Sequence, residues 1–190
     1  MNRLVTLLVL LLAGLLAGCG GGSRRTGIRA AETPADDVAE YQPRWRSHTV
    51  DSTQYRKVFL AGTIDMGRSA DWQAALVARF RDSIGGRWLF FNPRRREFHA
   101  SPAEMEYQVA WELAHLEAAD LIVMNLLGDS RSPISLLEMG LYARSGKLFV
   151  ACSPDYYRYD NVRITCRRYG VPLYDSLTAL LDDLPQQSDE

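Results

Sequence analysis

The chain has 190 residues, with 22 Lys and Arg against 23 Asp and Glu, so its formal net charge is −1. This balance gives no reason to expect nucleic acid as an electrostatic partner. His48, His99 and His115 are scattered along the chain, which contains neither a glycine-rich dinucleotide motif nor a P-loop. We therefore expect no metal and no cofactor.

Residues 1–18 have the pattern of a secretory signal peptide. Arg3 precedes a leucine-rich run of about fourteen residues, which is shorter than the roughly twenty that a membrane-spanning helix needs. The run LAGC at residues 16–19 resembles the lipobox of bacterial lipoproteins, in which the cysteine is lipidated. We expect a lipid anchor on Cys19 and a domain outside the cytoplasm, in the bacterial cell envelope, with the outer membrane slightly favoured because Asp does not follow Cys19. The alternative is an ordinary signal peptide that contains a cysteine.

Residues 19–52 are expected to form the lipidated cysteine and a flexible tether. They continue from GGGS through Pro34 and Pro43 without sustained periodicity. Such a composition cannot bury enough apolar surface to offset the entropy lost on ordering. The sequence then predicts one folded domain over residues 53–185 and a short disordered tail over residues 186–190.

Within the domain, aliphatic runs alternate with amphipathic segments. The runs predict strands at residues 57–61, 87–91, 120–127, 147–152 and 172–174. Helices are expected at residues 71–84, 101–119, 133–145, 160–168 and 175–184, with Ser101, Ser132 and Asp160 as N-terminal caps. Apolar strands separated by helices should pair in parallel and be covered on both faces. The predicted fold is therefore α/β, a flavodoxin-like, doubly wound, five-stranded parallel sheet with helices on both faces.

The carboxyl ends of these strands predict a binding crevice. Ligands of doubly wound sheets bind beyond the carboxyl ends of the strands, where the strand order reverses. This rule places Gly62, Thr63, Asn92, Asn125 and the start of the helix that carries Glu138 around one crevice.

Two glutamates within helices are candidates for chemistry. Glu138 lies on a mostly apolar helix face, where a charge needs a reason. It is either a nucleophile or general base held in a cleft, or a half-solvated residue favoured by the helix N-terminus. Glu112 lies in the middle of the preceding helix. It is either a surface residue, paired with His115 three positions on, or the partner of Glu138 across the crevice.

Five stretches of the domain carry a resemblance. They are FLAGTID at residues 59–65, Asp71 with Trp72, NPRR at residues 92–95, QVAWELAHLEAADLIVMNL at residues 108–126, and SPISLLEMGLYARSGK at residues 132–147. Together they resemble the nucleoside 2-deoxyribosyltransferase superfamily, and most closely its divergent deoxyribosyltransferase-like branch. The similarity covers the folded domain in the family's order.

The resemblance implies a mechanism and a set of site residues. Glu138 would be the nucleophile that attacks the anomeric carbon of a nucleoside, expels the base and forms a glycosyl-enzyme ester. Glu112 would handle protonation at the base, and Asn161 would be donated by the neighbouring subunit of a homo-oligomer. The substrate-binding positions are then Phe59, Gly62, Thr63, Asp71, Trp72, Asn92, Arg94, Asn125, Ser132 and Asn161.

Three positions depart from the family's pattern. Phe59 stands where characterised members have an aromatic hydroxyl, Ser132 where they have a base-binding carboxylate, and Glu112 where the transferases have Asp. The base, the sugar and the choice between transfer and hydrolysis therefore stay open. Arg94–Arg96 form either an anion-binding group, which would suit a nucleotide, or a solvated patch.

Three hypotheses of function follow. The favoured one is a lipid-anchored enzyme that hydrolyses or transfers the N-glycosidic bond of a nucleoside or nucleotide, and hydrolysis suits a compartment poor in free bases. The alternatives are a non-catalytic nucleoside- or nucleotide-binding module and an envelope interaction protein. Cys152 and Cys166 form either a disulfide or two buried thiols.

Overall fold

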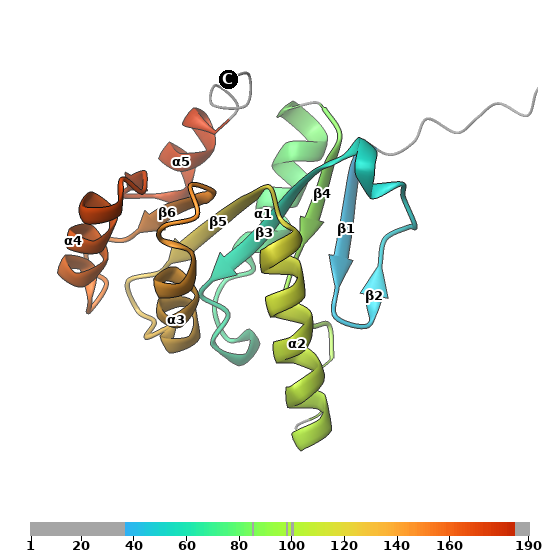
Figure 1. Cartoon of the computed structure of the whole chain (residues 1–190), viewed down its shortest axis with the longest axis horizontal. Coiled ribbons are helices and arrows are strands. Elements are labelled where there is room, and N and C mark those ends of the chain that lie inside the picture. Colours follow the sequence, from blue (N-terminus) through green and yellow to red (C-terminus); the bar gives the residue numbers. More distant parts are fainter. Residues whose placement is uncertain (1–36, 85, 98, 100, 185–190) are drawn as a thin grey trace, which may run out of the picture. The chain divides into compact units, whose positions relative to one another are not determined.

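The computed structural model describes residues 37–184 other than residues 85, 98 and 100 (Figure 1). The predicted signal peptide, the expected lipidation site at Cys19, the first part of the predicted tether and the predicted tail at residues 186–190 lie outside the described residues. Among the residues that are described, no helix combines the length and apolar character needed to cross a bilayer.

A sheet of seven strands runs through the described part of the chain. Its strands are β1 (Val38–Gln42), β2 (Trp45–Arg46), β3 (Arg56–Gly62), β4 (Trp88–Phe91), β5 (Leu121–Leu126), β6 (Leu148–Cys152) and β7 (Leu173–Tyr174). The spatial order is β2-β1-β4-β3-β5-β6-β7, and neighbouring strands are parallel except β1 with β2. The five predicted strands form the run β4-β3-β5-β6-β7, which is the flavodoxin-like order. The predicted fold class is therefore confirmed.

The predicted strand count and tether are wrong at the N-terminal side of the domain, because residues 38–46 belong to the sheet. β1 pairs in parallel with β4, from Val38 opposite Trp88 to Tyr41 opposite Phe91. The side chains of Val38, Ala39 and Tyr41 are buried, so this short segment is ordered by burial against the domain. β1 and β2 also cover the edge that β4 would otherwise expose to solvent.

The described part of the chain has five α-helices, of which four connect strands and the last follows β7. They are α1 (Trp72–Arg79), α2 (Pro102–Ala118), α3 (Pro133–Tyr142), α4 (Tyr159–Tyr169) and α5 (Leu177–Asp183). A π-helical turn, Phe80–Ile84, continues α1, and 3-10 turns span Ser52–Gln54 and Asp65–Gly67. The five predicted helices are confirmed, with ends that differ by a few residues.

The caps of the helices differ from one another. Asp71 and Ser101 each accept a hydrogen bond from the backbone N–H three residues on, at the starts of α1 and α2. Ser132 occupies the cap position of α3, but its φ of 40° is left-handed and its side chain makes no capping bond there, so the predicted capping role is wrong. The predicted cap at Asp160 is also wrong, because Arg158 holds that position in α4.

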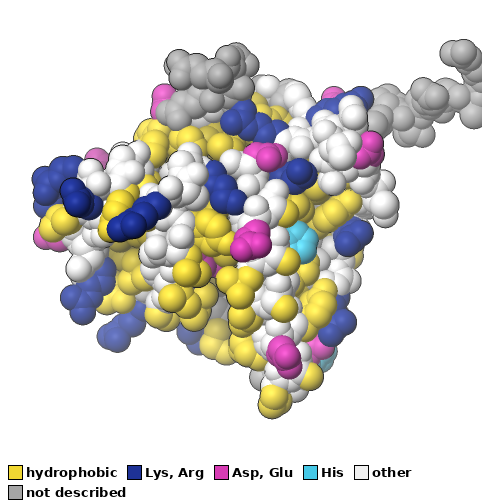
Figure 2. Space-filling model, viewed as in Figure 1, with side chains coloured by type: hydrophobic (Ala, Val, Ile, Leu, Met, Phe, Trp, Pro, Cys, Tyr) yellow, Lys and Arg dark blue, Asp and Glu magenta, His cyan; other side chains and the backbone are white. Residues whose placement is uncertain are grey.

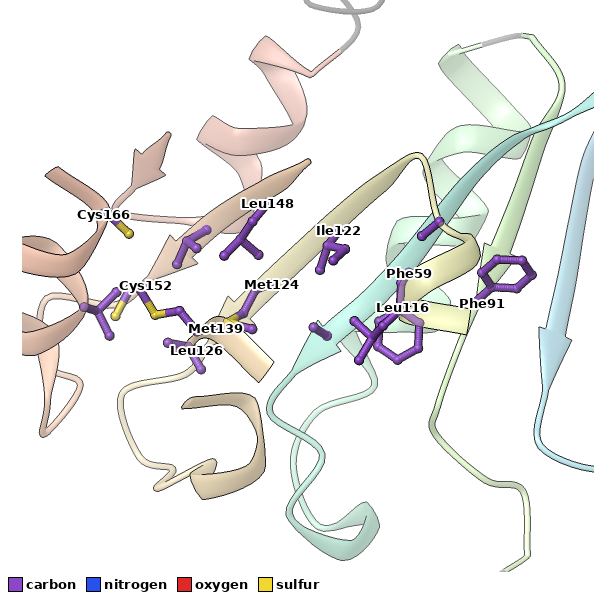
Figure 3. Packing of buried hydrophobic residues seen from close by; sticks show 14 of the residues in the cluster. Phe59, Phe91, Leu116, Ile122, Met124, Leu126, Met139, Leu148, Cys152 and Cys166 are labelled. Carbon is purple, nitrogen blue, oxygen red and sulfur yellow. The ribbon is translucent and has the colours of Figure 1, made fainter. Parts of the chain in front are cut away.

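Helices cover both faces of the sheet. Side chains of α2, α3 and α4 join the core on one face, and those of α1 and α5 join it on the other. Figure 3 shows part of the core on the first face, with Phe59, Leu116, Ile122 and Met124 close to the sheet. α2 follows β4 and α3 follows β5, so the starts of both helices lie near the carboxyl ends of the central strands.

The two cysteines of the described chain lie in this core as free, buried thiols. Cys152 ends β6 and Cys166 belongs to α4, and both are labelled in Figure 3. Burial raises the pKa of Cys152 to about 12 and that of Cys166 to about 11, so both stay protonated at neutral pH. Of the two alternatives that the sequence leaves open, the structure has the buried thiols.

Candidate active site

A cavity of about 340 Å³ lies between α2 and α3 at the carboxyl end of β3. Its position agrees with the crevice that the strand pattern predicts. It is lined by Ala61, Gly62, Ile64, Asp65, Met66, Pro93, Met105, Gln108, Val109, Glu112, Ser132, Pro133, Ile134, Ser135 and Glu138. Four residues expected to belong to the site, Gly62, Glu112, Ser132 and Glu138, therefore share one cavity.

Gly62 forms the floor of the cavity, where β3 approaches β5 closely. Its φ is 125°, and a Cβ atom at this position would lie only 2.2 Å from the carbonyl oxygen of Asn125. The next residue, Thr63, donates its backbone N–H to that same oxygen at 2.9 Å. Glycine is needed here because any side chain would push β3 and β5 apart.

A cluster of hydroxyl groups joins the end of β3 to the start of α3. The Thr63 and Ser132 hydroxyls lie 2.8 Å apart, and those of Ser132 and Ser130 lie 2.7 Å apart. Ser130 in turn donates to the Asp65 carboxylate at 3.0 Å. The backbone N–H of Leu127 completes the cluster by donating to the Thr63 hydroxyl at 3.0 Å. The loop before α3 is therefore tied to the loop after β3 by side-chain bonds.

Strained backbone accompanies this cluster. Asp65, Met66 and Ser132 have φ values of 48°, 55° and 40°, in the left-handed region that side chains disfavour. Each such residue costs on the order of 1 kcal/mol and persists only where the surroundings hold it. All three line the cavity.

Glu138 projects from the second turn of α3 into the cavity and is 8% exposed. Its pKa is raised to about 8, mainly by burial and to a smaller extent by the nearby Glu112. Among the described residues, no cation or hydrogen-bond donor contributes against this rise. The interpretation of Glu138 as a half-solvated residue is therefore wrong, because its carboxyl group is taken out of water.

Glu112 reaches the same cavity from α2. Its Oε1 accepts a hydrogen bond of 2.7 Å from Nε2 of Gln108, one turn earlier in the helix. Burial raises its pKa, while the Gln108 bond and the Arg95 charge act in the opposite direction. The two carboxyl groups thus share a cavity, and only Glu112 has groups that favour its charged form.

The interpretation of Glu112 as a surface partner of His115 is also wrong. The Nδ1 atom of His115 bonds to the carbonyl oxygen of Trp111 at 2.7 Å. Its ring stacks on Trp111 with centroids 3.9 Å apart and meets the ring of Phe91 edge-on. His115 therefore belongs to the packing between α2 and the sheet.

Three further expected residues support the walls of the site without lining the cavity. Phe59 is fully buried, 6.3 Å from the Trp111 ring between centroids. Trp72 is buried and donates its indole N–H to the Thr63 carbonyl at 2.8 Å. Asp71 caps α1. These residues hold the β3–α1 loop and the base of α2 in place.

The three asparagines that the sequence predicts at the substrate site lie outside the Glu138 cavity. Asn92 donates to Glu40 at 2.8 Å and accepts from the backbone N–H of Arg94 at 3.0 Å, so it joins β1 to the β4–α2 loop. Asn125 is buried at the end of β5, beside Gly62. Asn161 lines a separate groove of about 300 Å³ between α3 and α4. None of the three lines the Glu138 cavity within its own chain.

The three consecutive arginines line the wider hollow described below, where Arg96 is exposed while Arg94 and Arg95 are largely covered and bonded within the chain. The side chains of Arg94 and Arg95 are only 12% and 8% exposed. Arg94 donates to the carbonyl groups of Gly67, Ser69 and Ala70, and Arg95 bonds to Glu104 and Gln108. Arg96 lies over the Trp45 ring, 3.7 Å from its centroid. These contacts fix the β4–α2 loop.

A wider hollow of about 990 Å³ adjoins the Glu138 cavity. Both share Ile64, Met66, Pro93, Met105, Gln108 and Glu112. The buried carboxyl pair therefore opens toward a larger space with room for the part of a ligand that extends beyond a sugar ring.

Sequence reasoning assigns no role to three residues of the site, Asp65, Gln108 and Ser130. Gln108 could have been recognised, since it stands four residues before Glu112 and side chains at that spacing meet on a helix. Asp65 and Ser130 lie 65 positions apart, so their bond depends on the tertiary fold. Within the described residues, no group of three His, Cys, Asp or Glu side chains is placed to hold a metal ion.

Comparisons with known proteins bear on the family and the fold. A sequence profile described as "Nucleoside 2-deoxyribosyltransferase like" matches residues 55–156, more than half of the chain. No curated protein sequence matches. The fold is similar to the crystal structure of a conserved protein from Enterococcus faecalis V583, with a TM-score of 0.51 and 15% identity over 70% of this chain and 99% of that one. The chain belongs to the nucleoside 2-deoxyribosyltransferase-like family.

Proposed function

We propose that the protein cleaves or transfers the N-glycosidic bond of a nucleoside or nucleotide through a covalent glycosyl-enzyme on Glu138. The observation that carries this proposal is the pair of carboxyl groups, buried Glu138 of α3 and half-buried Glu112 of α2, that line one cavity. Carboxyl pairs of this kind supply a nucleophile and an acid at glycosidic bonds. Membership of the family supports a nucleoside as the substrate class.

In the first step, the Glu138 carboxylate attacks the anomeric carbon while the bond from that carbon to the base nitrogen breaks. Glu112 gives its proton to the departing base, so the base leaves neutral and Glu112 becomes charged. In the second step, Glu112 takes a proton from water or from an acceptor base, which attacks the same carbon and releases Glu138 as a carboxylate. Water yields the free sugar, and a base yields a new nucleoside.

The protonation states needed for this reaction follow from the shared cavity. Two buried carboxyl groups that repel each other hold one proton between them over a wide pH range. The reactive arrangement places that proton on Glu112 and the charge on Glu138. The pKa of about 8 at Glu138 arises because no described group of the chain stabilises that charge.

The test is base release by the full chain in detergent. Nucleosides and 5′-nucleotides are incubated with and without an added free base, and the products are separated by chromatography. Glu138→Gln is the loss variant, and Glu106→Gln, on the exposed side of α2, is its matched control. Release without an acceptor, lost only in Glu138→Gln, supports a hydrolase. A strict need for an acceptor supports a transferase, and release that survives Glu138→Gln contradicts the mechanism.

A second candidate is a binding module without turnover. It is favoured by the absence of any group that stabilises the Glu138 charge among the described residues, and by Phe59, which offers no hydroxyl. It predicts that nucleosides or nucleotides raise the melting temperature of the protein while no base is released.

We also propose that the protein is anchored to the bacterial cell envelope by a lipid on Cys19. The support is the sequence of residues 1–19, with its short apolar run ending in LAGC. Cys19→Ser should move the protein from the membrane fraction to the soluble fraction of cells. A protein that stays with the membrane after this change would contradict the anchor.

A homo-oligomer is proposed from an apolar surface on α2 and α3. Six of its side chains are between 43% and 61% exposed, namely Met105, Val109, Leu113, Ile134, Leu137 and Leu141. Figure 2 shows hydrophobic side chains gathered over these two helices. Their spacings of three and four residues form one stripe on each helix, so two copies could pack stripe to stripe about a two-fold axis.

The partner proposed for this surface is a second copy of the chain. Glu106 and Glu117 are the charged residues on the exposed side of α2, which disfavours an anionic lipid surface. Light scattering should give a dimer or a larger assembly. Leu137→Asp should dissociate this assembly. Ile164→Asp, the same kind of change at an exposed apolar residue of α4, should leave it intact. A monomeric wild-type chain contradicts the proposal.

A further inference from the structure

A chain of polar contacts runs from the β1–β2 hairpin to the candidate active site. Arg44, in the hairpin, donates to Glu104 at 2.7 Å. Glu104 accepts from Arg95 at 2.9 Å through its other oxygen. Arg95 donates through Nε to Oε1 of Gln108, and Gln108 donates to Glu112 at 2.7 Å. These five residues are called the relay below.

The relay fixes the orientation of the Gln108 amide. Its oxygen accepts from Arg95, and its Nε2 group donates both to Glu112 and to the carbonyl oxygen of Pro93, at 3.0 Å. A flipped amide would direct its NH₂ group at the Arg95 cation and its oxygen at the Glu112 carboxylate, losing every one of these bonds. The amide is therefore locked as a donor toward Glu112.

The hairpin end of the relay is more exposed than its other end, with the Arg44 side chain 59% exposed, but Arg44 makes further contacts. Arg44 lies over the Tyr107 ring, 4.1 Å from its centroid, and its backbone N–H donates to the Tyr107 hydroxyl. Its φ is 61°, a left-handed conformation that these contacts hold. Arg44 lies outside the residues that the family profile matches, so the relay joins a segment outside the matched range to site residues within it.

We propose that Gln108 is a positioning residue for Glu112, and that the Arg44–Glu104–Arg95 ion pairs hold Gln108 in place, so the N-terminal hairpin sets the acid–base behaviour of the site. The consequence for catalysis rests on the role proposed above for Glu112. The structural part of the proposal is independent of it. The relay favours the carboxylate form of Glu112, which is the form that remains once Glu112 has given its proton to the departing base.

Several groups face Glu112 from the elements around it. Glu138 of α3 disfavours its charge, and Asp65 of the β3–α1 loop lines the same cavity. Arg95 of the β4–α2 loop favours the charge. Loss of Arg95 or of the Gln108 donor therefore raises the pKa of Glu112. When Glu112 is protonated, its charge no longer repels that of Glu138, so the pKa of Glu138 falls.

The test is a carbon-13 NMR titration of the glutamate carboxyl groups of the full chain in detergent, with the Glu112 signal assigned from Glu112→Gln. Arg95→Gln and Gln108→Met should each raise the pKa of Glu112 by about one unit. Arg96→Gln removes the same charge one residue away, outside the relay, and should leave that pKa in place. If Arg95→Gln and Arg96→Gln shifted the pKa of Glu112 equally, the effect would come from the lost charge alone, and the proposed relay would be wrong.

The hairpin end is tested by Arg44. Arg44→Gln should raise the pKa of Glu112 by a few tenths of a unit, because Arg95 then turns toward Glu104 alone, and Arg44→Lys should restore most of the shift. Circular dichroism melting identifies any variant that has unfolded. If Arg44→Gln is unfolded, the pKa of Glu112 is compared between the wild type and Arg44→Lys, which keeps the charge. An unchanged pKa in a folded Arg44→Gln protein overturns the role of the hairpin.

The titration needs no turnover, so the two proposals fail separately. If the wild-type chain releases no base, the proposed function fails while the titration still decides the relay. If base is released and the relay variants leave the Glu112 titration unmoved, the relay fails while the function stands. Where both hold, Gln108→Met should shift the alkaline limb of the pH profile of kcat/KM in parallel with the NMR pKa, because Glu112 acts in its protonated form.

Discussion

The two sides of the cavity treat their carboxyl groups differently. On the α3 side, no described donor or cation favours the charge of Glu138, and the hydroxyl cluster at the start of α3 bonds within itself and to Asp65. On the α2 side, Glu112 accepts from Gln108 and lies near the Arg95 charge. Both carboxyl groups lose water, but one receives compensation and the other does not. The difference shows how two identical side chains can take separate roles in one site.

The change with the largest expected effect removes the proposed nucleophile. Glu138→Gln keeps the shape of the side chain and should lower base release by at least about 10⁴-fold, since a covalent mechanism cannot proceed without the attacking carboxylate. Chromatographic assay of the purified variant measures this loss. The fold should survive, because a neutral amide suits the buried position. Near-normal turnover by Glu138→Gln would show that Glu138 is not the nucleophile, and the two carboxyl groups would then not have the separate roles proposed.

The same burial predicts a pH dependence of stability that needs no substrate. The pKa of Glu138 is about 8 in the folded chain, and an exposed glutamate titrates near 4.3, so the folded state binds the proton more tightly. Its contribution is full below about pH 4 and is lost as the pH rises to about 8, by roughly 5 kcal/mol in total.

Urea unfolding of the wild type and of Glu138→Gln between pH 5 and pH 8 measures this contribution. The wild-type free energy of unfolding should fall with rising pH, and the variant, which has no titrating group at this position, should fall less steeply. Parallel curves for the two proteins would mean that Glu138 is solvated in the folded state, contrary to the structure.

Removing the acid on the other side should have a smaller effect. Glu112→Gln should lower base release by about 10²-fold, the usual contribution of general acid catalysis, with the loss greatest for bases that leave poorly when unprotonated. Assay of several nucleosides that differ in base tests this gradient. An equal loss for every base would assign Glu112 to binding in place of proton transfer.

The sequence predicts the five central strands and five helices because apolar runs and capping residues are local signals. It misses β1, whose sequence VAEYQ is short and half polar, because only pairing with β4 orders it. It predicts Glu138 correctly as a residue of the cavity from a charge on an apolar helix face. It misplaces Asn92 and Arg94 relative to the cavity, since the end of a strand identifies an edge of the sheet but not the direction of each side chain.

The smallest expected effect concerns the strained start of α3. Ser132→Ala and Ser132→Gly both remove the hydroxyl that bonds to Thr63 and Ser130, and each should cost about 1 kcal/mol of unfolding free energy for those bonds. Glycine adopts the φ of 40° without the penalty that alanine carries, so Ser132→Gly should be the more stable variant by about 1 kcal/mol. Urea unfolding at one pH measures both. If alanine proves equally stable, the left-handed turn is not strained, and the α3 side differs from the α2 side in electrostatics alone.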